Sequence, residues 1–406
     1  MTPEQGKHTS ALVLPGGGAR GAFQVGVLKA VAELLPKTAA NPFDVISGTS
    51  AGAVNTVVLA AKARRFRVAI AELERVWGHF HCNHVYRTDH LTMLRSSLHW
   101  LAAIVTGGLV GMPKSLLDNA PLRALLSQNI RFPRIRSAID RGWLDAVAVT
   151  AAGYGSARST TFFEATSDHH PWSRTKRVGV PSDLNLDHLM ASIAVPMIFP
   201  PVRIGGEFFG DGAMRQATPL SPVIHLGADR ILVIGVRNEI VDYSPGPLEP
   251  QAHPTFAQIA GYMLDTLFMD GLYSDLERMT RINQLVDSVP EEQRTGVLKE
   301  MRPLDTMVVV PSEDLREMAY RHRKELPVAL RILLRGIGGR GHRENRLLSY
   351  LLFERAFTRE LMDLGYRDAM AVKDELMAFV MGEDVPRLFA PSWLRHDLST
   401  IGGDTP

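Results

Sequence analysis

The chain of 406 residues has little cysteine and no excess of either charge. Its one cysteine, Cys82, cannot form a disulfide within the chain, so we expect a reducing compartment. The 45 lysines and arginines nearly balance the 43 aspartates and glutamates, which gives no reason to expect a nucleic-acid partner. The first residues lack the basic and then apolar pattern of a signal peptide, and we therefore expect a cytoplasmic protein.

The sequence also lacks long hydrophobic runs and recognisable metal motifs. The best candidate for a membrane span, residues 101–112, is broken by Gly107 and Gly108 and has about 12 residues where a span needs roughly 20. We expect this segment to be a buried helix or loop, or else a lid or acyl-chain wall near the active site. The histidines of residues 79–84 match no zinc spacing, so no metal site is predicted.

The sequence does contain enough apolar residues, 45% of the chain, for a deep core. Short apolar runs alternate with helical stretches, which predicts an α/β fold with a mainly parallel central sheet covered by helices on both faces. A helical period over 254–286 predicts one long helix. The expected strands are 11–14, 43–47, 144–150, 159–165, 230–236 and 306–310.

The most informative motif is Gly48-Thr49-Ser50-Ala51-Gly52, which reads G-x-S-x-G. It follows the β-prone run 43–47 and precedes helix-forming residues at 53–63. A strand–turn–helix junction of this kind holds a serine hydroxyl outward on a tight turn. Gly48 and Gly52 are expected to flank the turn because side chains there would collide with neighbouring backbone. Ser50 is therefore a candidate nucleophile.

A second motif is the glycine-rich turn Gly16-Gly17-Gly18-Ala19-Arg20-Gly21, between the apolar run 11–14 and a helical stretch at 22–35. Backbone N–H groups in such a turn face one direction, and the helix dipole adds partial positive charge. The turn is thus expected to bind an anion, which in acyl transfer is the oxyanion of the tetrahedral intermediate.

The same glycines fit the dinucleotide fingerprint G-x-G-x-x-G, so a nucleotide-binding module is an alternative. That fingerprint requires an acidic residue at the end of the second strand. The only acid nearby is Asp44, which comes before the apolar part of its strand and so at the wrong end. The second strand delivers Ser50 instead.

A third motif is Phe208-Phe209-Gly210-Asp211-Gly212-Ala213. With it, the chain resembles the patatin-like lipid acyl hydrolases over about residues 10–310. Three motifs match in the order of that family: the G-G-G-x-R-G loop at 16–21, G-T-S-A-G at 48–52 and D-G-A at 211–213. The run A-S-x-A-x-P-x-x-F-P-P-V at 191–202 resembles the family's helix leading into the aspartate, and 115–123 resembles a further segment. Ala213 stands where glycine is commoner.

The resemblance implies a catalytic dyad without histidine, in which Ser50 is the nucleophile and Asp211 the general base and acid. Arg20 would orient the glycine loop or contact a lipid phosphate. The implied substrate is a phospholipid or other acyl lipid, met in transient contact with a membrane surface, and no cofactor or metal is implied. The oxyanion hole would be formed by the glycine loop, at Gly16, Gly17, Gly18 and Gly21.

The chemistry of the residues is consistent with such a dyad, because partial burial away from cations raises the pKa of an aspartate and makes it a better base. Two other readings stay open, a Ser-Asp-His triad and a catalytically silent relative that binds lipid. None of the histidines after Asp211 lies in a recognisable loop after a strand; they are His225, His253, His322, His342 and His396.

The composition changes after Pro311, and we expect a catalytic domain at 8–312 and a helical C-terminal extension at 313–406. Residues 316–346 contain nine lysines and arginines against three glutamates, with an apolar stripe that includes Leu326 and Leu330. Such a basic amphipathic segment either packs on the core or lies on an anionic membrane surface. Both possibilities are kept.

Overall fold

The computed structural model describes residues 8–87, 115–216, 218–237, 253, 256–336, 345–383 and 385–391. The segment 101–112, expected to be a buried segment or a lid, lies outside these ranges. None of the helices in the described ranges combines the length and apolar character needed to cross a membrane.

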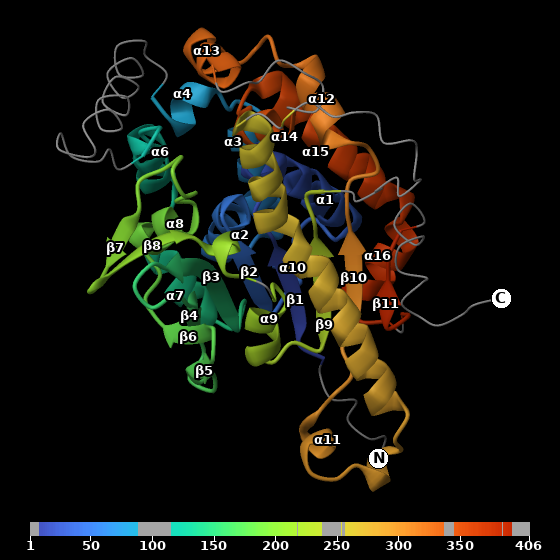
Figure 1. Cartoon of the computed structure of the whole chain (residues 1–406). Coiled ribbons are helices and arrows are strands. Elements are labelled where there is room, and N and C mark those ends of the chain that lie inside the picture. Colours follow the sequence, from blue (N-terminus) through green and yellow to red (C-terminus); the bar gives the residue numbers. More distant parts are fainter. Residues whose placement is uncertain are drawn as a thin grey trace.

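Eleven strands of the described chain form one sheet (Figure 1). The strands are β1 (Ser10–Leu14), β2 (Val45–Thr49), β3 (Ala146–Gly153), β4 (Ser159–Ala165), β5 (Trp172–Arg174), β6 (Arg177–Pro181), β7 (Val202–Ile204), β8 (Glu207–Asp211), β9 (Arg230–Ile234), β10 (Asp305–Val309) and β11 (Leu388–Phe389).

The order β11-β10-β9-β1-β2-β3 is parallel throughout, and β4, β6 and β5 extend the sheet beyond β3. Antiparallel pairing begins where β4 joins β3, and β8 also runs antiparallel to β3. The predicted α/β fold with a mainly parallel central sheet is confirmed.

Helices lie on both faces of this sheet. The first half of the chain contributes α1 (Gly21–Leu34), α2 (Ala51–Ala61), α3 (Phe66–Trp77), α4 (Cys82–Val85), α6 (Ala120–Asn129), α7 (Pro133–Asp140), α8 (Leu186–Ser192) and α9 (Ser221–His225). The second half contributes α10 (Phe256–Asp287), α11 (Val297–Glu300), α12 (Leu315–Arg321), α13 (Val328–Gly336), α14 (Asn345–Leu351), α15 (Arg355–Ala371) and α16 (Lys373–Val380). Short 3₁₀ turns occur at η1 (Gly18–Arg20), η2 (Gly212–Met214) and η3 (Glu291–Gln293).

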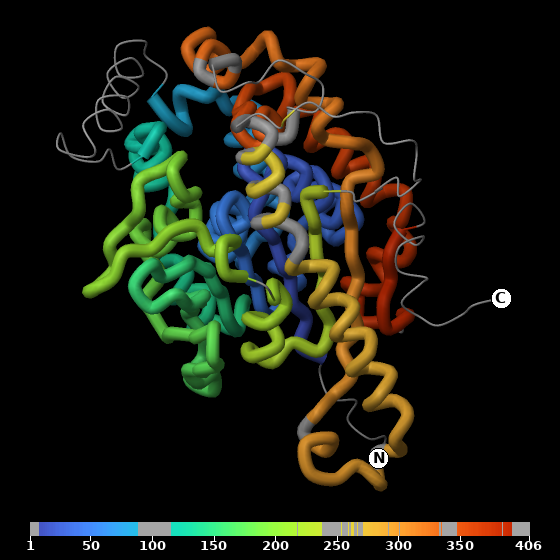
Figure 2. The backbone as a smooth tube through the Cα atoms, viewed as in Figure 1, coloured from blue at the N-terminus to red at the C-terminus, as the bar shows by residue number. Residues whose placement is uncertain are grey.

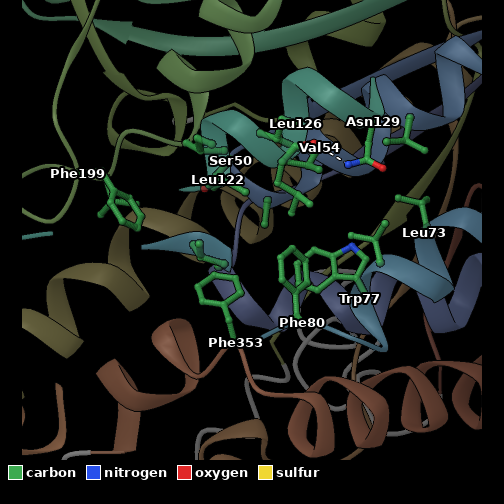
Figure 3. A pocket seen from close by; sticks show the side chains of 18 of the residues that line it. Ser50, Val54, Leu73, Trp77, Phe80, Leu122, Leu126, Asn129, Phe199 and Phe353 are labelled. Carbon is green, nitrogen blue, oxygen red and sulfur yellow. Dashed lines mark hydrogen bonds between the residues drawn. The ribbon is translucent and has the colours of Figure 1, made fainter. Parts of the chain in front are cut away.

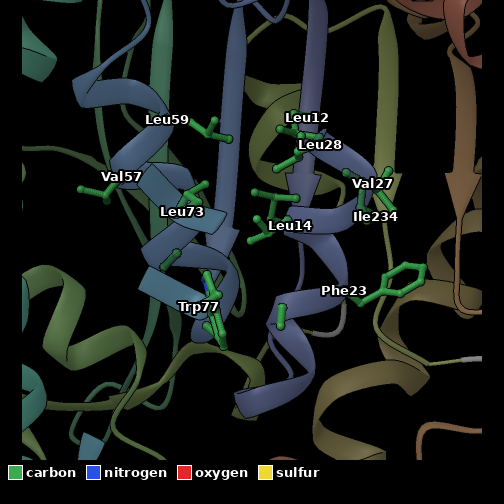
Figure 4. Packing of buried hydrophobic residues seen from close by; sticks show 14 of the residues in the cluster. Leu12, Leu14, Phe23, Val27, Leu28, Val57, Leu59, Leu73, Trp77 and Ile234 are labelled. Atoms are coloured by element: carbon green, nitrogen blue, oxygen red, sulfur yellow. The ribbon is translucent and has the colours of Figure 1, made fainter. Parts of the chain in front are cut away.

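The alternation of side chains along β1 divides the core into two layers. Leu12 and Leu14 pack with residues of α1, α2 and α3, such as Leu28 and Leu73 (Figure 4). Ala11 and Val13 point to the other face, into a cluster with residues of α9 and α10. Because successive side chains of a strand face opposite sides, a strand buried on both faces needs the continuous apolar run that the sequence has at 11–14.

One expected helix is wrong. The run 191–202 was expected to be helical, but α8 ends at Ser192 and the chain continues in turns to β7. Pro196, Pro200 and Pro201 explain the difference, since proline lacks an N–H donor and its ring disrupts a continuing helix. At the other end, the Asn185 side chain caps α8 by accepting from the N–H groups of Asp187 and His188.

The segment after residue 312 belongs to the same layers. α15 packs along α1, and β11 pairs with β10 at the edge of the sheet (Figures 1 and 2). Leu326 and Leu330 of the basic segment are buried, so this part of its apolar stripe is packed against the core. The domain boundary at 312 stays a prediction.

Candidate active site

Ser50 occupies the turn between β2 and α2, with φ 54° and ψ −127°. A residue other than glycine rarely adopts this conformation, and it is held by close packing on both sides. A Cβ at Gly52 would lie 1.9 Å from the carbonyl oxygen of Leu14, and one at Gly48 would lie 2.3 Å from Oγ1 of Thr56. Only glycine therefore fits at these two positions, as the sequence indicated.

The sheet register brings Asp211 beside Ser50. The pairing of β2 with β3 ends at Thr49, which lies opposite Thr150. The next residue of β3, Ala151, pairs instead with Asp211 of β8. Asp211 therefore lies beside β3 at the point where the chain leaves β2 and turns at Ser50. A Cβ at Gly212 would lie 2.1 Å from the carbonyl oxygen of Thr150, which explains why glycine follows the aspartate.

The Asp211 carboxyl group is buried, with 1% of the residue exposed. Burial raises its pKa from 3.8 to about 7, against the opposing effects of the Ser50 hydroxyl and the Ala213 N–H. Oδ1 accepts the Ala213 N–H at 2.9 Å. Oδ2 has no partner of regular hydrogen-bond geometry in the described part of the chain, although Ser50 is near enough to act on the pKa. Oδ2 is therefore the oxygen available to a proton from Ser50.

Two residues of the 191–202 run position this pair. The Ser192 hydroxyl accepts the Ser50 N–H at 2.9 Å and donates to the Thr150 carbonyl at 2.7 Å. The Ala194 carbonyl accepts the Asp211 N–H at 2.8 Å. No motif in the sequence predicts this role for Ser192. The position of Ser192 within the 191–202 run that resembles the family was the only indication in the sequence. Ser192 and Ser50 are 142 residues apart, so their contact could not be read from the sequence.

The glycine loop lies against α14. Gly18 has φ +56°, and a Cβ there would lie 2.4 Å from the Tyr350 carbonyl oxygen. In the described chain no hydrogen bond occupies the N–H groups of Gly17 and Gly18. The Gly21 N–H, in contrast, donates within the turn to carbonyls that include that of Gly18. Gly16, Gly17 and Gly18 are thus the predicted glycines whose N–H groups stay available to an oxyanion in the described chain, whereas that of Gly21 is occupied.

Arg20 is buried, with 1% exposed, which excludes a solvated position at the helix start. Its Nε donates to the Ser349 hydroxyl at 3.0 Å and its Nη1 to the Tyr350 hydroxyl at 3.1 Å. Its guanidinium also lies 3.9 Å from the centroid of the Tyr350 ring. Of the two roles expected for Arg20, the contacts favour orientation of the loop, through α14.

An apolar pocket extends from Ser50 between α2, α3 and α6 (Figure 3). It encloses about 990 Å³, part of it open to solvent. Gly18 and Ser50 lie in its wall, and most of the other lining side chains are aliphatic or aromatic. The aromatic part of the wall is Trp77, Phe80, Phe199, Tyr350 and Phe353. A space with this apolar lining suits an acyl chain.

The described histidines after Asp211 do not complete a triad. His225 donates from Nδ1 to the Ser221 carbonyl at 2.8 Å and stacks on Trp172. His322 pairs with Glu325 and Glu360, and His253 is exposed. His342 and His396 lie outside the described residues. Among described residues, no histidine lines the pocket that contains Ser50.

Comparison with known proteins gives one curated relative and several solved structures. The relative is the cGAMP-activated phospholipase of Pseudomonas aeruginosa (strain BWHPSA011 / Pa011), 28% identical over 209 residues, which are 51% of this chain and 53% of the relative. The chain thus spans about half the length of this relative.

VipD from Legionella pneumophila superposes with a TM-score of 0.31 and 13% identity, covering 88% of this chain and 67% of VipD. ExoU, in its complex with SpcU from Pseudomonas aeruginosa, gives 0.23 and 15%, covering 98% and 83%. Similarity at this level supports neither a shared fold nor a shared function.

A sequence model of the patatin-like phospholipase family matches residues 12–224, just over half of the chain. The matched part contains the glycine loop, the turn at Ser50 and Asp211. Membership of this family supports hydrolysis of lipid esters. The chain therefore belongs to the patatin-like phospholipase family.

Proposed function

We propose that the chain is a serine lipid acyl hydrolase that cleaves carboxylic esters of phospholipids or other acyl lipids through Ser50 and Asp211. The observation that carries this proposal is the buried Asp211 carboxyl group, with its pKa raised to about 7, beside Ser50, which lines an apolar pocket. A general base is most effective when its pKa lies near the working pH. The phospholipase A type of cleavage is part of the proposal.

In the first half of the reaction, Asp211 accepts the Ser50 proton and Oγ forms a bond to the ester carbonyl carbon. The N–H groups of Gly17 and Gly18 stabilise the oxyanion that develops. The bond to the leaving alcohol then breaks, and Asp211 returns the proton to that alcohol. The acyl group remains on Ser50, with its chain in the apolar pocket.

In the second half, Asp211 deprotonates a water molecule that attacks the acyl carbonyl. The fatty acid leaves, and Ser50 recovers its proton from Asp211. One carboxyl group thus serves both halves of the reaction. Asp211 is ionised again at the end of each half, as the next proton transfer requires. No histidine is required in this scheme.

Reaction with an alkyl fluorophosphonate tests this proposal, because the reagent phosphonylates an activated serine. Mass spectrometry of the 406-residue chain is expected to find the label on Ser50, and Ser50→Ala is expected to remain unlabelled and to hydrolyse no phospholipid. Labelling elsewhere would identify another nucleophile. A protein that binds lipid vesicles but takes no label would be the silent relative, and tight nucleotide binding by calorimetry would favour the nucleotide-binding module.

Lipids in a bilayer reach Ser50 only if the protein approaches the membrane, so the proposal includes transient contact with a membrane surface. Val328 and Ile332 of α13 are exposed, at 51% and 61%, beside the basic residue Arg331. Vesicle co-sedimentation of a Val328→Asp, Ile332→Asp double variant is expected to show weaker binding than wild type. Hydrolysis of a short soluble ester is expected to persist in that variant.

The curated relative is cGAMP-activated. We include in the proposal that the hydrolase activity of this chain responds to a cyclic dinucleotide. Phospholipid hydrolysis by the purified protein, measured with and without cGAMP, tests this point separately from the fluorophosphonate reaction. Equal rates of hydrolysis with and without cGAMP would show that this chain does not share the activation by cGAMP of the relative.

A further inference from the structure

One face of α2 leads from Ser50 to a charged end. Val54, Val58 and Lys62 follow Ser50 at intervals of four residues, which places them on one side of the helix. At 1.5 Å of rise per residue, Val58 lies about 12 Å along the axis from Ser50. The surface that begins at the candidate nucleophile is therefore apolar for two turns and basic after that.

The chain at α6 shows the same change. Leu122, Leu125 and Leu126 line the apolar pocket opposite α2, followed by Asn129 and Ile130 at the end of the helix (Figure 3). Arg131 and Arg134 come directly after them and line a different pocket. Two separate elements thus pass from apolar to basic side chains where the two pockets meet.

The two pockets meet at three shared residues. Val58, Asn129 and Ile130 line both the apolar pocket and a second pocket of about 510 Å³. The second pocket contains Lys62, Arg131 and Arg134, and no acidic residue lines its described wall. Lys62 forms an ion pair with Glu72, which also lines the apolar pocket. The shared residues therefore form a partition between an apolar space and a cationic one.

We propose that this partition, Val58 with Ile130 and Asn129, sets the length of acyl chain that the enzyme accepts. The inference rests on the hydrolase function proposed above. An acyl chain bound to Ser50 meets the partition after about 12 Å. Each C–C bond is about 1.5 Å long but advances an extended zigzag chain by less than its length, so this distance corresponds to on the order of ten carbons. Beyond it, the charged side chains offer an alkyl group no favourable burial.

The test compares 4-nitrophenyl butyrate, decanoate and palmitate with wild type, Val58→Ala and the matched control Val57→Ala. Val57 is a fully buried valine of the same helix that lines neither pocket. For wild type, kcat/KM is expected to rise from butyrate to decanoate and to fall at palmitate. Val58→Ala is expected to raise the palmitate-to-decanoate ratio by about tenfold, because one methylene in an apolar pocket changes kcat/KM by this order. Val57→Ala is expected to keep the wild-type ratio.

A second variant keeps the test decisive if Val58→Ala fails to fold. Val58→Phe adds volume at the partition and is expected to shift the optimum toward butyrate. Labelling rates with short and long alkyl fluorophosphonates provide a readout that does not depend on deacylation. If both Val58 variants hydrolyse the esters with the palmitate-to-decanoate ratio of wild type, the inference about the partition is wrong while the proposed function stands. A wild type that neither labels nor hydrolyses would overturn the proposed function, and the inference with it.

Discussion

At the scale of single residues, the backbone of Ser50 is the feature that most departs from ordinary geometry. Its φ of 54° and ψ of −127° fall in a region that costs a non-glycine residue of order 1–3 kcal/mol. The surrounding structure holds this conformation, since the turn is packed against the Leu14 carbonyl on one side and the Thr56 hydroxyl on the other. The hydroxyl is thereby directed out of the sheet.

This strain gives a stability prediction. Ser50→Gly is expected to be more stable to chemical denaturation than Ser50→Ala by about 1 kcal/mol, because glycine adopts a positive φ without a steric penalty. Neither variant is expected to hydrolyse phospholipids. Urea unfolding of both variants, followed by circular dichroism, measures the difference. An alanine variant as stable as the glycine variant would show that the turn is not strained.

Asp211 gives a prediction about pH. Because the base must be ionised, kcat/KM for a soluble ester is expected to rise with pH through about 7, the pKa of the buried carboxyl group. Asp211→Asn is expected to lower kcat by roughly 10²–10⁴ and to remove this dependence. Stopped assays from acid to neutral pH provide the profile. A profile in Asp211→Asn that still rises through neutrality would assign the base to another group.

The raised pKa of Asp211 also affects the stability of the fold, which is expected to fall with rising pH whereas kcat/KM rises. As the pH rises from 3.8 toward 7, the unfolded carboxyl group ionises while the buried one stays neutral, so the folded state loses stability. A pKa raised from 3.8 to about 7 corresponds to on the order of 4 kcal/mol above neutrality. Thermal unfolding of Asp211→Asn is therefore expected at a higher temperature than that of wild type above neutral pH, although its kcat is lowered.

At the scale of elements, the sequence predicted the parts whose signal is local. All six expected strands exist, since short apolar runs such as 11–14 and 230–236 have few alternatives to burial in a sheet. The hairpin of β7 and β8 was missed, although Gly205 and Gly206 join strands that pair as Ile204 with Glu207. A two-residue glycine turn is a hairpin signal, but β7 has only three residues. β11, with two residues, depends on pairing with β10.

In the candidate site, too, the residues with a local sequence signal were predicted and those brought together by the fold were not. Ser50, Asp211 and the glycine loop were identified from motifs, because tight turns need glycine at fixed positions. The pocket wall was not identified, since Trp77, Leu122 and Phe353 come from distant parts of the sequence. The contact of Arg20 with α14 was likewise beyond reach, because 329 residues separate Arg20 from Ser349.

The contact between the glycine loop and α14 leads to a prediction with a matched control. Gly18 and Gly205 have nearly equal φ, +56° and +59°, but only Gly18 faces a neighbour, the Tyr350 carbonyl. Gly205→Ala is expected to cost about 1 kcal/mol from the backbone alone. Gly18→Ala is expected to cost more and to slow fluorophosphonate labelling of Ser50 by 10-fold or more, because α14 and the oxyanion donors must move apart.

Thermal unfolding and the labelling rate of both variants measure these two effects. The comparison isolates the contact from the backbone conformation, since both substitutions place a Cβ at the same φ. If Gly18→Ala and Gly205→Ala reacted with the probe at equal rates, the loop would not need its present position against α14 to support the reaction.

At the scale of the whole molecule, the C-terminal segment is part of the structure that forms the site. Tyr350, Leu351 and Phe353 line the apolar pocket, and Arg20 binds α14. The family match ends at residue 224, so these contributions come from outside the matched residues. Most of the pocket wall lies within the matched residues, and Tyr350, Leu351 and Phe353 complete it from the C-terminal segment.

The packing of α15 on α1 makes this dependence testable. A Cβ at Gly365 of α15 would lie 2.2 Å from the Phe23 carbonyl oxygen, and one at Gly26 of α1 would lie 2.0 Å from the Met362 carbonyl oxygen. The two helices thus approach each other through glycines on both sides. Backbone atoms cannot give way as the end of a side chain can, so any added Cβ must separate the helices.

Gly365→Ala is expected to lower the unfolding temperature, even though alanine favours a helix over glycine by about 1 kcal/mol. The matched control is Gly206→Ala, where an added Cβ meets nothing within 4 Å. Because α1 begins at the glycine loop and α15 follows the pocket residues of α14, separation of the two helices is expected to slow fluorophosphonate labelling of Ser50 as well. Differential scanning fluorimetry and mass spectrometry measure the two effects on the same samples. A Gly365→Ala protein that unfolds and labels like Gly206→Ala would show that the C-terminal helices can move away from α1 without consequence for the catalytic residues.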